Sequence, residues 1–263
     1  MKIIDFHTHL EDHWFAKKCL SEQQFLRGLD AYNIDVACIY TLMGFYSDCP
    51  GHNDLLVEAA KKNPDRLIPF VTVDPKLGDP AVEELERCLS NPVFRGVKFH
   101  PWVQAFAPSM VRETMVKILK CAARYRTPVL FHDGTPPYST TFQIAAMARW
   151  VPEATVVLGH GGLADYAYPA GQLLRDLPNL YVCACGPKAG DMPYLVEMAG
   201  EDRVIWGSDF GFSDPRIIAE RLDDVLESGL PPRVQEKIFY DNAARVLKMN
   251  ERPLPKILQK KER

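Results

Sequence analysis

The sequence of 263 residues lacks the long apolar segments that cross membranes. It contains no run of about 18 or more apolar residues, the length that a membrane-spanning helix needs. The N-terminus also lacks the layout of a signal peptide, because the polar Asp5, His7 and His9 interrupt the stretch where its apolar part would lie. We therefore expect a cytoplasmic protein that has no membrane partner.

Positive charge is not in excess either. The chain carries 31 Lys and Arg residues against 34 Asp and Glu residues, a formal net charge of −3, and no basic stripe runs through its body. Nucleic-acid-binding proteins need such a stripe to neutralise phosphates, so no nucleic-acid partner is expected. Hydrophobic residues make up 47% of the chain and charged residues 25%, which excludes a wholly disordered chain.

The signatures of disulfide frameworks and of nucleotide-binding loops are missing. The seven cysteines are an odd number and form no C-x-x-C pair, although Cys183 and Cys185 lie two residues apart. This usage is typical of reduced thiols. No G-x-G-x-x-G or Walker pattern occurs, and the turn after the first apolar run reads His7-Thr8-His9-Leu10 instead. An open sheet that binds a dinucleotide is therefore disfavoured.

Short apolar or β-branched runs alternate with helix-like segments along the whole chain. Apolar residues recur at helical spacing between the runs, for example over 110–126. Eight strand–helix units in about 250 residues are the count and length of a (β/α)8 TIM barrel, the α/β fold that we predict as one domain over residues 1–250. After the eighth strand we expect helices near 214–228 and 231–248 and a basic tail over 251–263. The eight strands are expected to begin near Ile3, Val36, Ile68, Gly96, Val129, Thr155, Leu180 and Val204.

Polar side chains gather where the expected strands end, which is where a TIM barrel carries its active site. Because strand side chains alternate, we expect His7 and His9 to point into the barrel. Ile4 and Phe6 would then face the surrounding helices. Five of the seven histidines follow strands in this way, together with a lysine and an aspartate: His7, His9, Lys98, His100, His132, His160 and Asp209.

Such a cluster predicts a metal site. Neutral imidazoles and a carboxylate in one dry barrel mouth lose hydration energy unless something compensates, and a divalent metal is the usual compensation. Three His side chains and one Asp form a good set of nitrogen and oxygen ligands. We expect one divalent transition metal per chain, with Zn²⁺ first, although iron, manganese, nickel or cobalt would accept the same donors.

The ordered motifs resemble those of the amidohydrolase superfamily, most closely its branch of short barrels related to aminocarboxymuconate semialdehyde decarboxylase and other metal-dependent hydrolases and decarboxylases. The resemblance covers nearly the whole chain. It is carried by Asp5-Phe6-His7-Thr8-His9, Pro64-Asp65-Arg66, Gly96-Val97-Lys98-Phe99-His100-Pro101, His160-Gly161-Gly162, Gly207-Ser208-Asp209 and Asn242-Ala243-Ala244-Arg245.

The resemblance implies a ligand set and a catalytic pair. It assigns one metal ion to His7, His9, His132 and Asp209, and it leaves His160 as a catalytic residue beside the metal. A metal-bound water has a pKa near neutrality, so Asp209 can take its proton, and His160 can orient the water or stabilise the developing oxyanion.

Lys98 opens a second possibility, because superfamily members such as dihydroorotase carry a carboxylated lysine on the fourth strand that bridges two metals. His132 and His160 would then serve a second ion. We favour one metal, with Lys98 orienting the substrate or balancing charge. His100 and Trp102 are further substrate-binding candidates, although His100 stands before Pro101 and could merely cap the strand.

Three functions remain open at this stage. The first is a metal-dependent hydrolase of an amide, lactone or ester in a small organic substrate, with Asp209 as general base and His160 assisting. The alternative is a metal-dependent, non-oxidative decarboxylase of an aromatic or unsaturated carboxylic acid. It needs an arginine for the carboxylate, and none follows a strand end closely, which leaves Arg149, Arg216 or an arginine of a neighbouring subunit for this role. The second alternative is a metal-bearing binding protein without turnover. Because barrels of this branch often pair, we favour a homodimer.

Overall fold

The computed structural model describes residues 1–11, 13–15, 17–163, 167–212 and 214–255. Eight parallel strands form one sheet in which each strand pairs with the next one along the chain. The first and last strands approach each other through a parallel bridge between Thr8 and Phe210 and a hydrogen bond of 3.2 Å from the Phe6 amide to the Trp206 carbonyl. The protein is therefore a (β/α)8 TIM barrel, as predicted. Its strands are β1 (Ile4–His9), β4 (Val36–Tyr40), β5 (Leu67–Val71), β6 (Gly96–Phe99), β7 (Val129–Phe131), β8 (Val156–Leu158), β9 (Leu180–Cys183) and β10 (Val204–Ile205).

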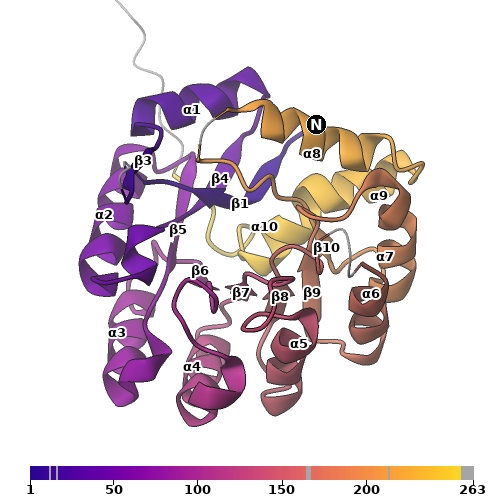
Figure 1. Cartoon of the computed structure of the whole chain (residues 1–263). Helices are drawn as coiled ribbons and strands as arrows, with labels where there is room; N and C mark the ends of the chain where they lie inside the picture. The colour runs from indigo at the N-terminus through magenta and orange to yellow at the C-terminus, as the bar shows by residue number, and fades with distance from the viewer. Residues whose placement is uncertain (12, 16, 164–166, 213, 256–263) are drawn as a thin grey trace, which may run out of the picture.

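Helices surround the strands (Figure 1). Two of them begin at capping boxes, in which Ser21 and Thr140 accept from the amide of the third helical residue. Every strand starts within one residue of the predicted position. The surrounding helices are α1 (Glu22–Ala31), α2 (Cys49–Lys62), α3 (Asp79–Leu89), α4 (Arg112–Arg124), α5 (Thr141–Trp150), α6 (Ala167–Asp176), α7 (Met192–Ala199) and α8 (Arg216–Leu226).

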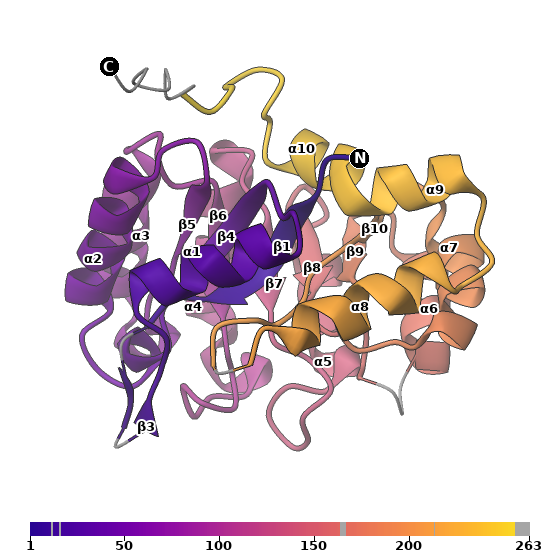
Figure 2. The same ribbon diagram turned by 90° about the horizontal axis from the view of Figure 1, so that it is seen from above.

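A helical stretch after α8 covers one end of the barrel. Helix α9 (Pro232–Glu236), a π-helical turn (Lys237–Asp241) and α10 (Asn242–Val246) together occupy the helix predicted at 231–248. A two-stranded hairpin, β2 (His13–Trp14) with β3 (Lys17–Lys18), follows the end of β1. Figure 2 shows α10 and the hairpin on opposite sides of the barrel, so α10 lies at the amino ends of the strands. Residues 256–263 of the predicted tail lie outside the described residues.

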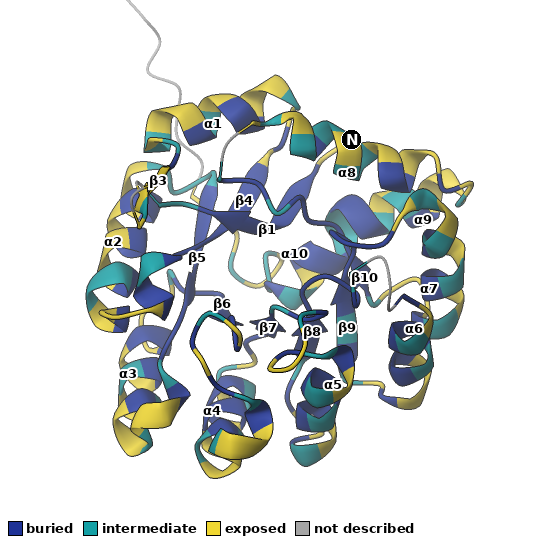
Figure 3. Cartoon of the chain, viewed as in Figure 1, coloured by how far each residue is buried: buried dark blue, intermediate teal, exposed yellow. Residues whose placement is uncertain are grey.

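Two apolar layers fill the molecule. The outer layer packs strand side chains such as Val97, Phe99 and Trp206 against the helices. The inner layer fills the barrel and includes Ile4, Phe6, Tyr40, Phe70, Leu130, Cys183 and Cys185, with Ala243, Ala244 and Leu247 of α10 closing its base. Figure 3 shows the strands buried and the exposed residues on the outer helix faces. Among the described residues, no helix is long and apolar enough to span a membrane.

The predicted alternation of β1 is wrong in one respect. Ile4 and Phe6 belong to the inner layer and do not face the helices. The pairing of β1 with β4 shifts register between Asp5 and Thr8, and such a bulge breaks strict alternation. Phe6 and His7 can therefore both point into the barrel. In this way β1 contributes apolar side chains to the core of the barrel and imidazoles to the site at the carboxyl ends of the strands.

Candidate metal centre

Three ligand atoms converge at the carboxyl ends of β1 and β10. His7 Nε2 and His9 Nε2 lie 3.4 and 3.1 Å from Oδ1 of Asp209. One ligand atom of each of these three residues lies within 4.8 Å of the others, a spacing that can hold a metal ion. The Asp209 backbone has a φ of 64°, a left-handed conformation that Asp adopts more readily than most residues, and its amide donates to the His7 carbonyl at 2.8 Å.

The donors at this point suit a divalent transition metal. Burial lowers the pKa of both His7 and His9, so the imidazoles are neutral and carry a lone pair. Burial opposes the charge of Asp209, but the hydrogen bond from His9 and the neighbouring His7 and His160 hold its pKa well below the usual range. The Asp209 side chain is 33% exposed, against 0% for His7. The donor set therefore opens to solvent on the side of the carboxylate.

The protein also fixes which nitrogen His7 offers. His7 Nδ1 lies 3.0 Å from the carbonyl oxygen of Gly159, and a carbonyl can only accept, so the ring proton is on Nδ1. Nε2 then keeps its lone pair and faces Asp209. A histidine ligand held from behind by a carbonyl in this way is the usual arrangement at metal sites. His9 Nδ1 is buried without a hydrogen-bond partner among the described residues.

Lys98 of β6 brings a positive charge to the same place. Its Nζ lies 2.9 Å from His7 Nε2 and 5.2 Å from the centre of the Tyr40 ring. Burial lowers the pKa of this lysine to about 8, so the amine is mainly protonated at neutral pH. Among the described residues, no carboxylate lies within ion-pairing distance of Lys98. Asp209 and Asp133 act on this charge only from beyond ion-pairing distance. A buried ammonium without a directly paired anion is costly, so it favours an anionic ligand.

His132 and His160 form a second group, next to the first. His160 Nε2 lies 2.8 Å from His132 Nδ1, and His132 Nε2 lies 2.8 Å from Thr135 Oγ1. The rings of His160 and His7 are 4.8 Å apart. Burial lowers the pKa of His160 to about 4 and that of His132 well below its ordinary value. His132 therefore lies beside the His7, His9 and Asp209 group without belonging to it in this arrangement.

His100 and Trp102 lie along the rim beyond His132. The rings of His100 and His132 stack at 3.8 Å with an angle of 13°. His100 also takes part in the turn that follows β6, because its amide donates to Gln104 Oε1 at 2.9 Å. Trp102 is 51% exposed, with its ring 6.2 Å from that of His100. The two predicted roles of His100, capping the strand and lining the site, are thus both compatible with its position.

Two buried carboxylates tie the strand ends together below these imidazoles. Asp133 accepts from the amides of His160 and Gly162, both at 2.7 Å, and so joins the loops after β7 and β8. Asp5 accepts from the amide and hydroxyl of Ser208 and so joins β1 to the loop after β10. Burial raises the pKa of Asp5 to about 7 and that of Asp133 to about 6. The sequence analysis did not single out Asp133, although it directly follows a predicted ligand.

Cys185 is another contact that sequence reasoning missed. Its Sγ lies 3.0 Å from His160 Nδ1, 3.4 Å from His7 Nδ1 and 2.9 Å from the Gly159 carbonyl oxygen. His7, His160 and Cys185 form a second group with the spacing of metal ligands. Because His7 Nδ1 already donates to Gly159, this group is better described as a hydrogen-bonded cluster.

The two arginines considered for binding a carboxylate lie elsewhere. Arg149 is on an exposed face of α5, and Arg216 is 80% exposed and pairs with Asp214 at 2.6 Å. Arg221 of α8 is 16% exposed and pairs with Asp224 at 3.1 Å, and its charge contributes to the lowered pKa of His160. The charge of Arg221 therefore acts on the histidine cluster.

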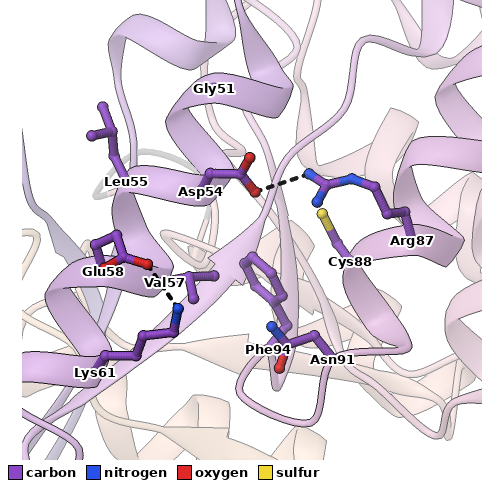
Figure 4. A pocket seen from close by; sticks show the side chains of 10 residues that line it. All are labelled: Gly51, Asp54, Leu55, Val57, Glu58, Lys61, Arg87, Cys88, Asn91 and Phe94. Atoms are coloured by element: carbon purple, nitrogen blue, oxygen red, sulfur yellow. Dashed lines mark hydrogen bonds and ion pairs between the residues drawn. The ribbon is translucent and has the colours of Figure 1, made fainter.

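A cavity of about 410 Å³ on the outer wall is unrelated to this cluster. It lies between α2 and α3, and its side chains include two exposed ion pairs, Arg87 with Asp54 at 3.1 Å and Lys61 with Glu58 at 2.8 Å (Figure 4). Phe94 and Val57 also line it. None of the predicted site residues lines this cavity, so it does not compete as the candidate site.

Comparisons with known proteins agree with the fold, and a family model matches most of the chain. The model of the amidohydrolase family matches residues 4–249. Among curated proteins, none matches the chain in sequence.

Three solved structures illustrate the structural likeness. The 2,6-dihydroxybenzoate decarboxylase from Rhizobium has a TM-score of 0.75 at 15% identity, over 95% of this chain and 99% of that one. The 5-carboxyvanillate decarboxylase from Novosphingobium aromaticivorans, in complex with manganese and 4-hydroxy-3-methoxy-5-nitrobenzoic acid, has a TM-score of 0.75 at 16% identity, over 94% and 96%. The 4-oxalomesaconate hydratase from Rhodopseudomonas palustris has a TM-score of 0.67 at 17% identity, over 95% and 96%.

Proposed function

Because this chain belongs to the amidohydrolase family and is thus an enzyme, we propose that it is a metal-dependent decarboxylase of a small aromatic or unsaturated carboxylic acid. The observation that carries this proposal is the buried ammonium of Lys98 beside His7, with no carboxylate of the described residues paired to it. An acidic substrate would supply the missing anion. Two of the structurally similar enzymes are decarboxylases of hydroxylated aromatic acids, which supports this class over hydrolysis, the reaction expected first from the sequence.

The proposed metal ligands are His7, His9, His132 and Asp209. When bound, a divalent ion would supply a Lewis acid that withdraws electrons from the substrate. Zn²⁺ and Mn²⁺ are the two candidates that we favour, zinc because imidazole suits it and manganese because a structurally similar enzyme holds it. We keep one ion per chain, since Lys98 Nζ as a free ammonium already has a role in binding the substrate. A carboxylated Lys98 with a second ion is the less favoured form.

The side chains of this chain divide the remaining work. Lys98 binds the substrate carboxylate before reaction, while His100 and Trp102 line the rim that holds the rest of the molecule. The bond between the substrate carbon and its carboxylate breaks, carbon dioxide leaves, and the electron pair stays on the carbon. A proton must then reach that carbon. The ionised carboxylate of Asp209 takes a proton from a solvent water on its exposed side and passes it to the carbon, and the hydroxide remains in solvent. His160 assists by holding the neighbouring imidazoles in place.

Hydrolysis of an amide, lactone or ester remains the second candidate. It is favoured by the ionised carboxylate of Asp209, which lies within hydrogen-bond reach of His9 and could take a proton from an attacking water.

One experiment separates the two reactions. The protein, loaded with Zn²⁺ or Mn²⁺, is incubated with a panel of hydroxybenzoates and unsaturated acids, with carbon dioxide release as readout, and in parallel with lactones, esters and amides. We expect turnover of acids only. Lys98→Met should raise KM for the acid by about tenfold or more, because it removes a charged hydrogen-bond donor, whereas Lys117→Met on the exposed face of α4 should change nothing. Turnover of neutral substrates, unaffected by Lys98→Met, would replace decarboxylation with hydrolysis.

We also propose a homodimer. Large apolar side chains are exposed at residues that follow β6 and β7, and a second copy would cover them. They are Trp102, Met110, Tyr138 and Phe142. Light scattering on the purified protein tests this, and a monomer at micromolar concentration would exclude it.

A further inference from the structure

The contacts around Cys185 form a chain that crosses three strand ends. It runs from the Gly159 carbonyl to Cys185 Sγ at 2.9 Å, from Sγ to His160 Nδ1 at 3.0 Å, and from His160 Nε2 to His132 Nδ1 at 2.8 Å. Thr135 Oγ1 ends the chain, 2.8 Å from His132 Nε2. Cys185 and His160 are almost fully buried, so water does not compete with these contacts.

Each contact in the chain needs one proton, and the chemistry of the groups decides where it comes from. The Gly159 carbonyl has no proton, so the thiol of Cys185 must donate to it. The thiol has only one proton, and the contact between Sγ and His160 Nδ1 must therefore use a proton of His160. A neutral imidazole has a single N–H, which leaves His160 Nε2 as an acceptor.

The same logic sets the tautomer of His132. His160 Nε2 can only accept, so the proton between the two rings belongs to His132 Nδ1. His132 Nε2 then carries a lone pair and accepts from the Thr135 hydroxyl. This order holds for the neutral form of both imidazoles, in which each ring carries one proton.

We propose that Cys185 is a positioning residue whose one thiol proton sets the tautomers of His160 and His132, so that His132 keeps an unprotonated Nε2. The proposal rests on the proposed function in one respect, since it takes His132 as a metal ligand. A histidine protonated at Nε2 cannot use that nitrogen for a metal. The thiol thus acts on the metal site through two rings and without contacting the ion.

Replacement of the thiol gives distinct expectations. In Cys185→Ala the Nδ1–H of His160 loses its acceptor, and the opposite tautomer, with protons on Nε2 of both rings, becomes populated. In Cys185→Ser the hydroxyl again has one proton for Gly159 and a lone pair for His160, so the original order returns. Cys38→Ala is the matched control, because Cys38 is a fully buried cysteine of the inner layer with no histidine partner among the described residues.

The test is a long-range proton–nitrogen correlation spectrum of metal-free protein labelled with ¹⁵N-histidine. His160→Gln and His132→Gln identify the two rings by loss of their signals. We expect Nδ1 to be protonated in both rings of the wild type, Cys185→Ser and Cys38→Ala, and a shift toward Nε2 protonation in Cys185→Ala. Titration with Zn²⁺ should show about tenfold or more weaker binding in Cys185→Ala alone, the size of effect usual for residues behind metal ligands.

Several results would overturn the proposal. A wild-type spectrum in which His160 is protonated at Nε2 would contradict the proposal. This result needs no variant, so it remains available if Cys185→Ala fails to fold. Unchanged tautomers in Cys185→Ala, or a failure of serine to restore them, would contradict it as well. Absence of decarboxylase activity would instead remove the proposed function and leave the tautomers as they are, so the two failures are distinguishable.

Discussion

Asp209 shows how one residue can combine an unusual backbone with a chemical role. It stands where the loop after β10 turns back over β1, with a φ of 64°, and its carboxylate contacts the imidazoles of His7 and His9. Asn and Asp occupy this left-handed region more often than other residues with a side chain. Asparagine therefore replaces the carboxylate with little effect on the turn.

Asp209→Asn should lower kcat by about 10²-fold or more, the contribution usual for a residue that transfers a proton. It should also reduce the metal content, because a neutral amide is a poorer ligand than a carboxylate. Steady-state kinetics and elemental analysis on the same preparations measure both effects. Since the turn is preserved, the thermal unfolding of metal-free protein should stay close to that of the wild type. Retained turnover would remove Asp209 from the mechanism.

The loop that carries Asp209 is itself an element fitted closely to β1. Gly211 has a φ of 136°, and a side-chain carbon at this position would overlap the carbonyl oxygen of His9. The amide of His9 donates to Phe210 at 2.7 Å, so the loop and the strand end are held as one unit. Only glycine permits this approach.

Gly211→Ala should therefore weaken metal binding by pushing the loop away from His9. Gly229→Ala is the matched control, because Gly229 also has a positive φ, 75°, but its added carbon would meet nothing within 4 Å. Both variants carry the backbone strain of alanine in this region, and only the first disturbs the site. Metal titration of the two variants measures the difference in affinity. Equal metal affinities of Gly211→Ala and Gly229→Ala would show that the loop does not position the ligands.

A second element contact fastens α2 to the end of β5. The buried side chain of Asn53 pairs with both the amide and the carbonyl of Thr72, at 3.0 and 2.9 Å. It also donates to Glu84 of α3 at 3.1 Å. One amide group thus joins a strand and two helices.

Asn53→Ala should lower the free energy of unfolding by about 2 kcal/mol, because it leaves buried backbone groups of Thr72 without partners. Urea denaturation measures the change. Asn250→Ala, at an exposed position, should stay within about 0.5 kcal/mol of the wild type. A loss no larger in Asn53→Ala than in this control would mean that solvent reaches the Thr72 groups.

At the scale of the whole molecule, the candidate metal centre and the helix that closes the barrel lie at opposite ends of the strands. The imidazoles and Asp209 follow the carboxyl ends of the strands, whereas α10 packs Ala243, Ala244 and Leu247 against the base of the inner layer. The candidate ligands come from β1 and from the loops after β7 and β10, which are distant parts of the chain. A bound ion would therefore join the first strand to the last.

Metal removal should therefore destabilise the entire barrel. At a free metal concentration 100 times its Kd, binding adds about 2.7 kcal/mol to the free energy of unfolding, which corresponds to about 5 to 10 °C in Tm for a chain of this size. Thermal unfolding with and without a chelator measures this. In Asp209→Asn the shift should be smaller. An identical Tm in both conditions for the wild type would argue against a tightly bound ion.

Much of this architecture follows from local pattern. The strand starts could be predicted within one residue because the period of apolar runs depends on neighbouring residues only. The inward direction of Lys98 also followed from alternation, and its contact with His7 agrees with that prediction. Alternation misplaced Ile4 and Phe6, because the bulge in β1 depends on how that strand pairs with β4.

The sequence by itself determined the barrel and the polar residues that follow the strands, since both depend on the spacing and type of nearby residues. Its ordered motifs carried the resemblance to the amidohydrolase superfamily, which the family model confirms. Only the tertiary structure decided which side chains meet. Cys185 contacts His160, and Asp133 accepts from the loop after the next strand. Lys98 contacts His7 of a distant strand without an ion-pair partner among the described residues. Each of these contacts joins strands that are many residues apart in the sequence. Contacts of this kind arise from the register and closure of the barrel, which depend on all eight strands at once.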